Sequence, residues 1–225
     1  MARFNILGET LISFDNKEIT LRPWRFDRRL LTLRYLAINE NRLRTICSYK
    51  SSFIGKCSDD IEKVLYTELD TCMWMLDDSI VSVYAVGTEG RTMSLILRTE
   101  KDVLCNIEIA LTLSEDTNTI TKHEFVGKEG VISDRSINEQ IPFEAVYLFE
   151  SDKKDPLSYT DMDSLMFGLS PYEISVTDNI IEILKNPAEY TSDVESDKKV
   201  KTLMNCVFES LKTGEVINVG GGLNE

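Results

Sequence analysis

Residues 80–113 read IVSVYAVGTEGRTMSLILRTEKDVLCNIEIALTL, and this stretch decides the fold. It holds three runs rich in Val, Ile, Leu and Thr, separated by turn-prone residues. Apolar and polar positions alternate through Ile107, Ile109 and Leu111, a pattern typical of strands with one buried face. A fourth such run occupies 119–126. The stretch therefore predicts an antiparallel meander in which consecutive strands pair.

Helical spacing of apolar residues flanks these strands on both sides. Upstream, Ser58-Asp59-Asp60 provides N-capping chemistry for a helix whose apolar stripe runs from Ile61 to Leu76. The sequence predicts an α+β fold, with an open, mostly antiparallel sheet and helices packed on one face. The remaining predicted elements are helices at 26–39, 161–169, 177–185 and 197–211, and strands at 43–53, 145–149 and 216–219.

The pattern also suggests how the chain is organised. Residues 1–23 contain short strand-like runs that end at Pro23, so we expect an N-terminal strand appendage. Residues 24–219 are expected to form one α+β domain. Residues 220–225 include three consecutive glycines, which favours a flexible tail rather than a phosphate-binding turn, because no helix follows them.

Composition narrows the classes of protein. The chain has 225 residues, of which 42% are hydrophobic, enough to bury a real core. Its net charge of -13 argues against nucleic acid as the main ligand, because phosphate binding needs clustered cations. The sequence has no run of roughly 18 apolar residues and its start does not resemble a secretory signal. We therefore expect a cytoplasmic protein that does not bind membranes.

The charge is distributed unevenly. Residues 1–56 hold 11 Lys and Arg against 5 Asp and Glu, whereas the remainder is strongly acidic. The basic side chains could bind an anionic ligand or an acidic partner. They could instead pair with the protein's own acidic half, and we favour this pairing within the protein. The run consists of Arg22, Arg25, Arg28, Arg29 and Arg34.

Metal binding and nucleophilic catalysis find little support. The five cysteines are widely spaced and lie mostly among apolar residues, so we expect buried thiols. The only histidine, His123, lies in a predicted strand, where we expect a surface or hydrogen-bonded side chain rather than a general base. No glycine fingerprint, P-loop or nucleophile elbow occurs. Three acid pairs could hold a cation, but capping and loop roles suit them better: Asp59/Asp60, Asp77/Asp78 and Asp161/Asp163.

Five phrases in order resemble the C-terminal domain of the glucose-fructose oxidoreductase/inositol dehydrogenase (Gfo/Idh/MocA) family, over residues 24–219. The first is similar to the family's R-R-F-D, the third to I-D-x-x-x-W-L-x-G followed by V-x-S-V-x-A, and the fourth to I-E-V-x-G-x-x-G-x-I. The phrases are Trp24–Asp27, Arg34–Ile46, Leu69–Ala85, His123–Ile132 and Ser210–Val216. The resemblance implies the substrate domain of a sugar or polyol dehydrogenase, and subunit contacts through the open sheet face.

Two departures from the family matter for function. The family's N-terminal Rossmann domain has no counterpart here, so we expect no cofactor site. The family's D-x-x-x-H-x-x-D helix would fall on Lys63, Thr67 and Asp70, and only the last aspartate is kept. Because threonine cannot take up a proton near pH 7 as imidazole does, we expect no catalytic residue. The resemblance leaves Arg25, Lys63, Thr67 and Asp70 as candidates for a sugar-like binding pocket.

Three functional hypotheses follow. The leading one is a catalytically silent binding or assembly subunit, forming a homodimer through the open sheet face and partnering a full oxidoreductase. The second is one part of an NAD(P)-dependent sugar or polyol oxidoreductase whose cofactor domain lies on another chain or outside the present sequence. The third is a protein-interaction module in which the pocket is closed and an apolar outer sheet face is used.

Overall fold

A computed structural model describes residues 4–6, 11–14, 17–88, 90–134, 145–161, 163–186 and 193–220. The strands of its large sheet are β4 (Ile46–Lys56), β5 (Ile80–Thr88), β6 (Thr92–Thr99), β7 (Leu104–Leu113), β8 (Ile120–Gly127), β9 (Gly130–Ser133), β10 (Ala145–Glu150), β11 (Leu157–Thr160) and β12 (Ile217–Asn218). Within the described residues, these nine strands run in the order β11-β10-β9-β8-β4-β7-β6-β5-β12. The predicted open, mostly antiparallel sheet is confirmed.

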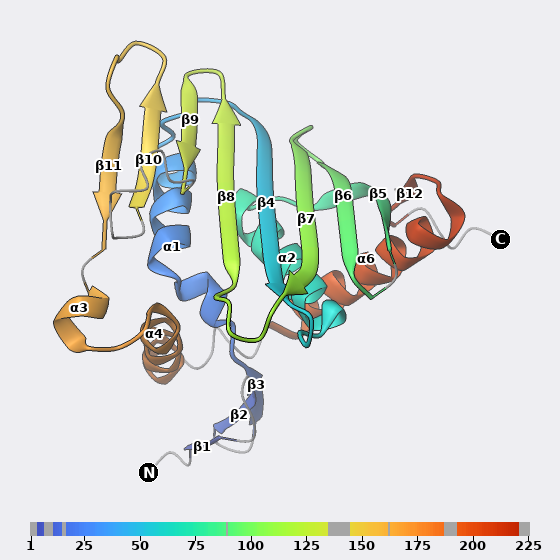
Figure 1. Ribbon diagram of the computed structural model, residues 1–225, viewed down its shortest axis with the longest axis horizontal. Helices are drawn as coiled ribbons and strands as arrows, with labels where there is room; N and C mark the ends of the chain where they lie inside the picture. The colour runs from blue at the N-terminus through green and yellow to red at the C-terminus, as the bar shows by residue number, and fades with distance from the viewer. Residues whose placement is uncertain are drawn as a thin grey trace.

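Three of the helices cover one face of this sheet. Figure 1 shows α1, α2 and α6 behind the strands, whereas α3 and α4 lie beside the lower end of the sheet. The α+β class and the one-sided packing are therefore as predicted. The helices are η1 (Pro23–Phe26), α1 (Arg28–Arg34), its π-helical continuation η2 (Tyr35–Asn39), α2 (Ile61–Leu76), α3 (Asp163–Phe167), α4 (Pro171–Lys185) and α6 (Asp193–Thr213).

The predicted meander is wrong at one point. β7 and β8 are consecutive in sequence but are not neighbours, because β4 lies between them. β4 runs parallel to β7 and antiparallel to β8, and its Tyr49 is in register with Cys105 on one side and Phe125 on the other. Alternation of apolar residues identifies a strand but not its neighbours. The parallel pairing of β4 with β7 joins strands that are separated in sequence by α2, β5 and β6, so no short sequence pattern predicts it.

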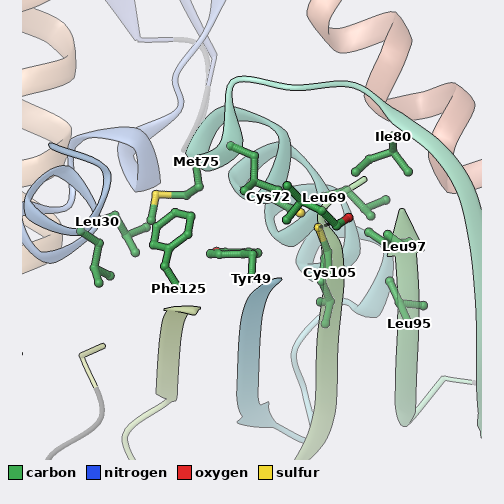
Figure 2. Packing of buried hydrophobic residues seen from close by; sticks show 14 of the residues in the cluster. Leu30, Tyr49, Leu69, Cys72, Met75, Ile80, Leu95, Leu97, Cys105 and Phe125 are labelled. Atoms are coloured by element: carbon green, nitrogen blue, oxygen red, sulfur yellow. Dashed lines mark hydrogen bonds between the residues drawn. The ribbon is translucent and has the colours of Figure 1, made fainter. Parts of the chain in front are cut away.

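The core lies between the sheet and its helices. Leu69, Cys72 and Met75 of α2 are fully buried and point toward Tyr49 and Phe125 of the sheet (Figure 2). The tyrosine and phenylalanine rings lie 5.1 Å apart at an interplanar angle of 51°. Aromatic rings tilted in this way pack well, and each buries a large apolar area. These contacts fix α2 against β4, β7 and β8. The position of the helix on the sheet in turn determines which residues its remaining faces contact.

The predicted start of α2 is confirmed, whereas α4 begins at Pro171 rather than at residue 177. Asp60 is the N-cap of α2, and its side chain accepts hydrogen bonds from the backbone N–H groups of Glu62 and Lys63. Asp27 caps α1 in the same way, accepting from Arg29 and Leu30. A carboxylate at this position satisfies N–H groups that have no partner within the helix and meets the positive end of the helix dipole.

Other predictions have mixed outcomes. Cys72 and Cys105 are buried as expected, but Cys47 and Cys57 are exposed, so the interpretation of all five cysteines as buried thiols is wrong. β11 was not predicted, because its short polar sequence carries no apolar alternation. Within the described residues, none of the helices combines the length and the apolar character that crossing a membrane requires.

The ends of the chain retain their predicted outline. β1 (Phe4–Ile6), β2 (Leu11–Phe14) and β3 (Lys17–Thr20) form a separate antiparallel sheet in that order. Figure 1 shows it projecting below the main sheet. The appendage and domain boundaries otherwise stay predictions, and the expected tail at 220–225 lies outside the described residues except for Gly220.

Candidate functional site

A cavity of about 870 Å³ lies at the lower end of the sheet, a size typical of small-molecule sites. Its lining comes from η1 and the start of α1, from α2, from β4 and β8, from the connection between β7 and β8, and from the first turn of α4. Three aromatic side chains, Trp24, Phe53 and Tyr172, share this lining with hydroxyl and charged groups. Segments far apart in sequence therefore converge on one concave space.

α4 closes one side of the cavity and is held mainly through the segment before α1. The side-chain oxygen of Asn179 accepts a buried hydrogen bond of 2.8 Å from the backbone N–H of Arg22. Asp178 forms a partly exposed ion pair with Arg28, 2.8 Å between Oδ2 and Nη2. The helix begins with a capping box between Ser170 and Glu173, so its first turn is ordered where it borders the cavity.

The four predicted site residues separate into two pairs. Lys63 and Thr67 line the cavity, as their spacing on one helix face suggested. Arg25 and Asp70 are absent from its lining and instead bind each other. The prediction that all four share one pocket is therefore not what the structure shows.

Asp70 is fully buried within a cluster of donors from the segment before α1. Its two carboxylate oxygens accept from Arg25 Nε at 2.9 Å and Nη2 at 2.6 Å, a bidentate pairing. Trp24 Nε1 donates to the same carboxylate at 2.7 Å, and Arg22 Nη1 lies 3.2 Å from it. This carboxylate is surrounded by cationic and hydrogen-bonding groups, and it fixes η1 onto α2. Its oxygen atoms are already occupied by these donors and are not available to a ligand.

The rest of the basic run also pairs within the chain. Arg28 meets Asp163 and Asp178, and Arg29 lies near Asp27 and Asp134. Arg34 donates to the backbone oxygen of Trp74 and its guanidinium lies 5.3 Å from the centre of that indole ring. The favoured interpretation, pairing with the protein's own acidic half, is confirmed for Arg28 and Arg29, whereas Arg34 binds a backbone oxygen and an indole ring.

Behind the cavity lies a set of four buried polar side chains, Ser51, Glu68, His123 and Asp134, here called the inner polar cluster. Glu68 and His123 line the cavity, and the other two support them. Ser51 donates a short hydrogen bond to the Glu68 carboxylate. Burial raises the pKa of Glu68, while the nearby charge of His123 and the Ser51 hydroxyl partly oppose that shift.

His123 and Asp134 form the second half of the inner polar cluster. Asp134 accepts from the backbone N–H of His123 at 2.6 Å, and its other oxygen lies 3.2 Å from His123 Nδ1. Burial alone would raise the pKa of Asp134, but the hydrogen bonds from His123 and the charge of Arg29 lower it overall. Asp134 is therefore an ionised carboxylate held against one side of the imidazole.

A buried hydroxyl adjoins this cluster. Tyr49 Oη has no hydrogen-bond partner in the part of the chain that the structure describes. The Tyr49 ring stacks on the imidazole of His123 with centroids 6.4 Å apart. Burial raises the pKa of Tyr49, and nearby negative charge, including that of Glu68 and Asp134, adds to the effect.

The sequence missed the inner polar cluster for a specific reason. His123 was expected to be a surface or hydrogen-bonded histidine, and its pairing with Asp134 confirms the second option. Its place at the cavity depends on Ser51 being its cross-strand neighbour, which follows only from the pairing of β4 with β8. A search for buried polar residues on the apolar faces of predicted strands would have marked Ser51 and His123.

A second, smaller cavity of about 520 Å³ lies on the other side of α1, beside β10 and β11. Its lining includes neither Glu68 nor His123, and so lacks the inner polar cluster. Among the described residues there is no group of three or more potential metal ligands. The larger cavity is therefore the candidate site.

Comparison with known proteins gives a consistent picture of the fold. No family model and no curated protein matches the sequence. Solved structures do match. A levoglucosan dehydrogenase in complex with NADH and levoglucosan has a TM-score of 0.69 at 13% identity, covering 88% of this chain and 65% of that chain. An oxidoreductase domain protein from Kribbella flavida has a TM-score of 0.66 at 11% identity, covering 88% and 64%.

A scyllo-inositol dehydrogenase from Lactobacillus casei gives a TM-score of 0.62 at 11% identity, covering 89% of this chain and 62% of that chain. At such identities the likeness establishes the fold alone. The chain spans less than two thirds of the length of these three proteins, as expected when one domain of a larger enzyme is matched. The fold that the sequence resemblance implied, that of the substrate domain of inositol and sugar dehydrogenases, is confirmed.

We predict that Asp70 acts in stability. Asp70→Asn should lower the free energy of unfolding by about 3–5 kcal/mol, because it removes the buried carboxylate charge that pairs with Arg22 and Arg25. Urea denaturation at pH 7 measures this. Asp77→Asn is the control, since that exposed residue ends α2 in a left-handed conformation that asparagine tolerates. A loss below about 1 kcal/mol for Asp70→Asn would contradict the structural role.

For Glu68 we predict that removing the charge stabilises the folded protein. Because burial raises its pKa, the folded protein holds this proton more tightly than the unfolded chain. Stability is therefore lost as the pH rises from the ordinary glutamate value through the raised one. Glu68→Gln should be more stable than the wild type at pH 8, by roughly 1–3 kcal/mol, and this difference should shrink toward pH 4.

Thermal and urea unfolding at both pH values measure this difference, with exposed Glu62→Gln on the same helix as the matched control. A Glu68→Gln variant that is less stable at every pH would show that the carboxylate is well paired in the fold.

Proposed function

We propose that this chain is a binding domain for small polyhydroxylated molecules, which does not transfer hydride by itself and serves as a binding or assembly subunit. The observation that carries the proposal is the cavity of about 870 Å³ with Glu68 and His123 on its lining, in a fold shared with dehydrogenases of inositol and levoglucosan. The cavity has ample room for a single sugar or cyclitol ring.

The chemistry of the lining suits such ligands. Trp24, Phe53 and Tyr172 offer aromatic faces, which pack against the C–H surfaces of sugar rings. Glu68 and Thr67 offer oxygen atoms to ligand hydroxyls, and Lys63 offers a cationic donor. A lining with a few placed polar groups among apolar surface is typical of selective small-molecule sites.

Catalytic silence is supported by the position where the family carries its histidine. Thr67 stands there, and its hydroxyl donates to the backbone oxygen of Lys63 at 3.0 Å within the same helix. A threonine so placed cannot accept a proton from a substrate near neutral pH.

The described residues also do not fit a dinucleotide. Its pyrophosphate needs a glycine-rich turn at a helix N-terminus, whereas Asp59 and Asp60 directly precede α2 beside the cavity. Carboxylates there would repel phosphate. Hydride chemistry at this cavity would need a cofactor domain supplied from elsewhere, which is the second functional hypothesis, and a partner oxidoreductase chain would provide it.

The sheet face opposite the helices supports a second proposal, a homodimer through the open sheet. No helix of the described residues covers this face in Figure 1. Four aliphatic side chains on its strands are between 42% and 46% exposed: Val86, Ile96, Leu104 and Ile120. They alternate with charged groups such as the Lys50–Glu124 pair, so the face is amphipathic rather than wholly apolar. Such a surface suits a subunit contact better than bulk water.

Calorimetric titration tests the binding function. We expect saturable binding of myo-inositol or levoglucosan, no binding of NADH, and no turnover when both are present. Lys63→Met and Thr67→Val should each weaken ligand binding several-fold while leaving the fold intact, because both residues line the cavity on an accessible helix face.

The matched control is Thr202→Val on α6, whose hydroxyl makes the same bond to the preceding turn, far from the cavity lining. Saturable NADH binding with turnover would establish an enzyme and end the proposal of silence. Absence of any ligand binding would favour the interaction module.

Light scattering tests the dimer. At tens of micromolar the wild type should have twice the monomer mass, and Ile96→Arg should restore the monomer because it places a charge on the proposed contact face. Ile181→Arg is the control, since Ile181 is similarly exposed, at 41%, but lies on α4. A monomeric wild type at these concentrations would contradict the sheet-face dimer.

A further inference from the structure

We propose that His123, oriented by Asp134, is the acceptor in the cavity that receives a hydrogen bond from a ligand hydroxyl through Nε2, with Glu68 meeting a second hydroxyl of the same ligand. This inference rests on the proposed binding function and makes it more specific. It assigns the ligand class as a neutral molecule with at least two hydroxyl groups close together. It also adds a residue of the sheet, His123 on β8, to recognition chemistry that the sequence placed mainly on α2.

The orientation of the imidazole follows from its partner. Asp134 Oδ2 lies 3.2 Å from Nδ1, and Asp134 is 4% exposed. The Asp134 carboxylate already accepts from the backbone N–H of His123 and lies against Nδ1, so it acts toward the ring only as an acceptor. Nδ1 must then be the protonated nitrogen. In neutral imidazole the other nitrogen, Nε2, then carries a free lone pair.

Asp134 is itself held in place. Its Oδ1 accepts from the backbone N–H of His123 at 2.6 Å, and Arg29 Nη1 approaches Oδ2 at 3.7 Å. A carboxylate fixed from three sides cannot rotate away from the ring. Residues that fix a histidine tautomer in this way determine which nitrogen faces a substrate.

The groups that face His123 leave the cavity side to a ligand. Among the described residues, the Tyr49 ring lies 6.4 Å from the imidazole between centroids, Asp134 occupies Nδ1, and the Glu68 carboxyl approaches from α2. Arg29 on α1 is directed at Asp134 and at Thr121, to which its Nη2 donates at 3.2 Å. His123 nevertheless lines the cavity. Its imidazole is therefore fixed by protein contacts on the inner side and meets the cavity on the other.

The second hydroxyl contact follows from the strand register. Ser51 on β4 and His123 on β8 are directly paired, which places their side chains next to each other on the inner face. Ser51 donates to Glu68, so the Glu68 carboxylate is anchored beside the histidine. Two oxygen-binding groups at such close range suit adjacent hydroxyls on one ring rather than a single hydroxyl.

A purely structural role does not account for these residues. A buried ionised carboxylate and a second buried carboxyl each cost free energy relative to apolar side chains of similar size. Groups held at such a cost collect at functional sites. In the inner polar cluster both carboxyls flank the one histidine that opens onto the cavity.

Because His123 is the only histidine in the sequence, nitrogen-15 NMR of histidine-labelled protein reports on this ring without any assignment step. In the free protein we expect a protonated Nδ1 and an unprotonated Nε2. Titration with myo-inositol and with levoglucosan should then shift the Nε2 resonance saturably, with the dissociation constant found by calorimetry. The Nδ1 resonance should move less, since its bond to Asp134 persists.

A variant gives an independent readout. Asp134→Asn lets the amide donate to Nδ1, which turns Nε2 into the protonated nitrogen and removes the acceptor. Affinity for the bound probe should fall about tenfold or more. The control is Glu124→Gln on β8, the strand that carries His123; its carboxylate pairs with Lys50 on the opposite sheet face, so the change should leave affinity unchanged.

The outcomes separate this inference from the proposed function. Probe binding with an unchanged Nε2 resonance would overturn the role of His123 and leave the binding function standing. A free protein in which Nε2 carries the proton would also overturn it. Failure of both probes to bind would overturn both proposals. The wild-type spectra decide the question even if Asp134→Asn does not fold.

Discussion

The pairing of β4 with both β7 and β8 is the constraint on which the rest of the structure depends. It places the longest described strand at the centre of the sheet, where its Tyr49 packs beneath α2 and its Ser51 faces His123. A direct hairpin between β7 and β8 would satisfy the same backbone groups, but it would remove Ser51 from its position beside His123. The position of one strand thus sets the core, the seat of α2 and the chemistry of the site.

How much of this follows from sequence depends on the range of the interaction. The cap at Asp60 and the apolar stripe of α2 are local, and both were predicted because a short spacing and a period encode them. The neighbours of β4 are not local, so the meander was wrong and His123 seemed isolated. Spacing put Asp70 on the face of Lys63 and Thr67, but only tertiary structure shows that η1 covers that end of the helix.

Two buried carboxylates on α2 illustrate different uses of charge. Asp70 is surrounded by two arginines and an indole N–H, so its charge is balanced and ties the segment before α1 to the core. Glu68 has a serine hydroxyl and a more distant imidazole, and burial raises its pKa. In the Asp70 arrangement the carboxylate oxygens already have protein donors, so a ligand would form no additional hydrogen bond there. The Glu68 arrangement leaves an oxygen-binding group whose desolvation a hydroxyl-bearing ligand can relieve.

The way α4 is attached has a consequence for kinetics. Within the described residues, a buried hydrogen bond from Arg22 to Asn179, a partly exposed ion pair from Arg28 to Asp178 and the buried side chains of Ile174 and Ile183 hold this helix beside the cavity. Local opening of α4 therefore requires far less free energy than disruption of the sheet. Ligand entry and exit can follow this movement of α4. The residues of the sheet then determine the affinity for the ligand, whereas the opening of α4 determines how often the ligand is exchanged.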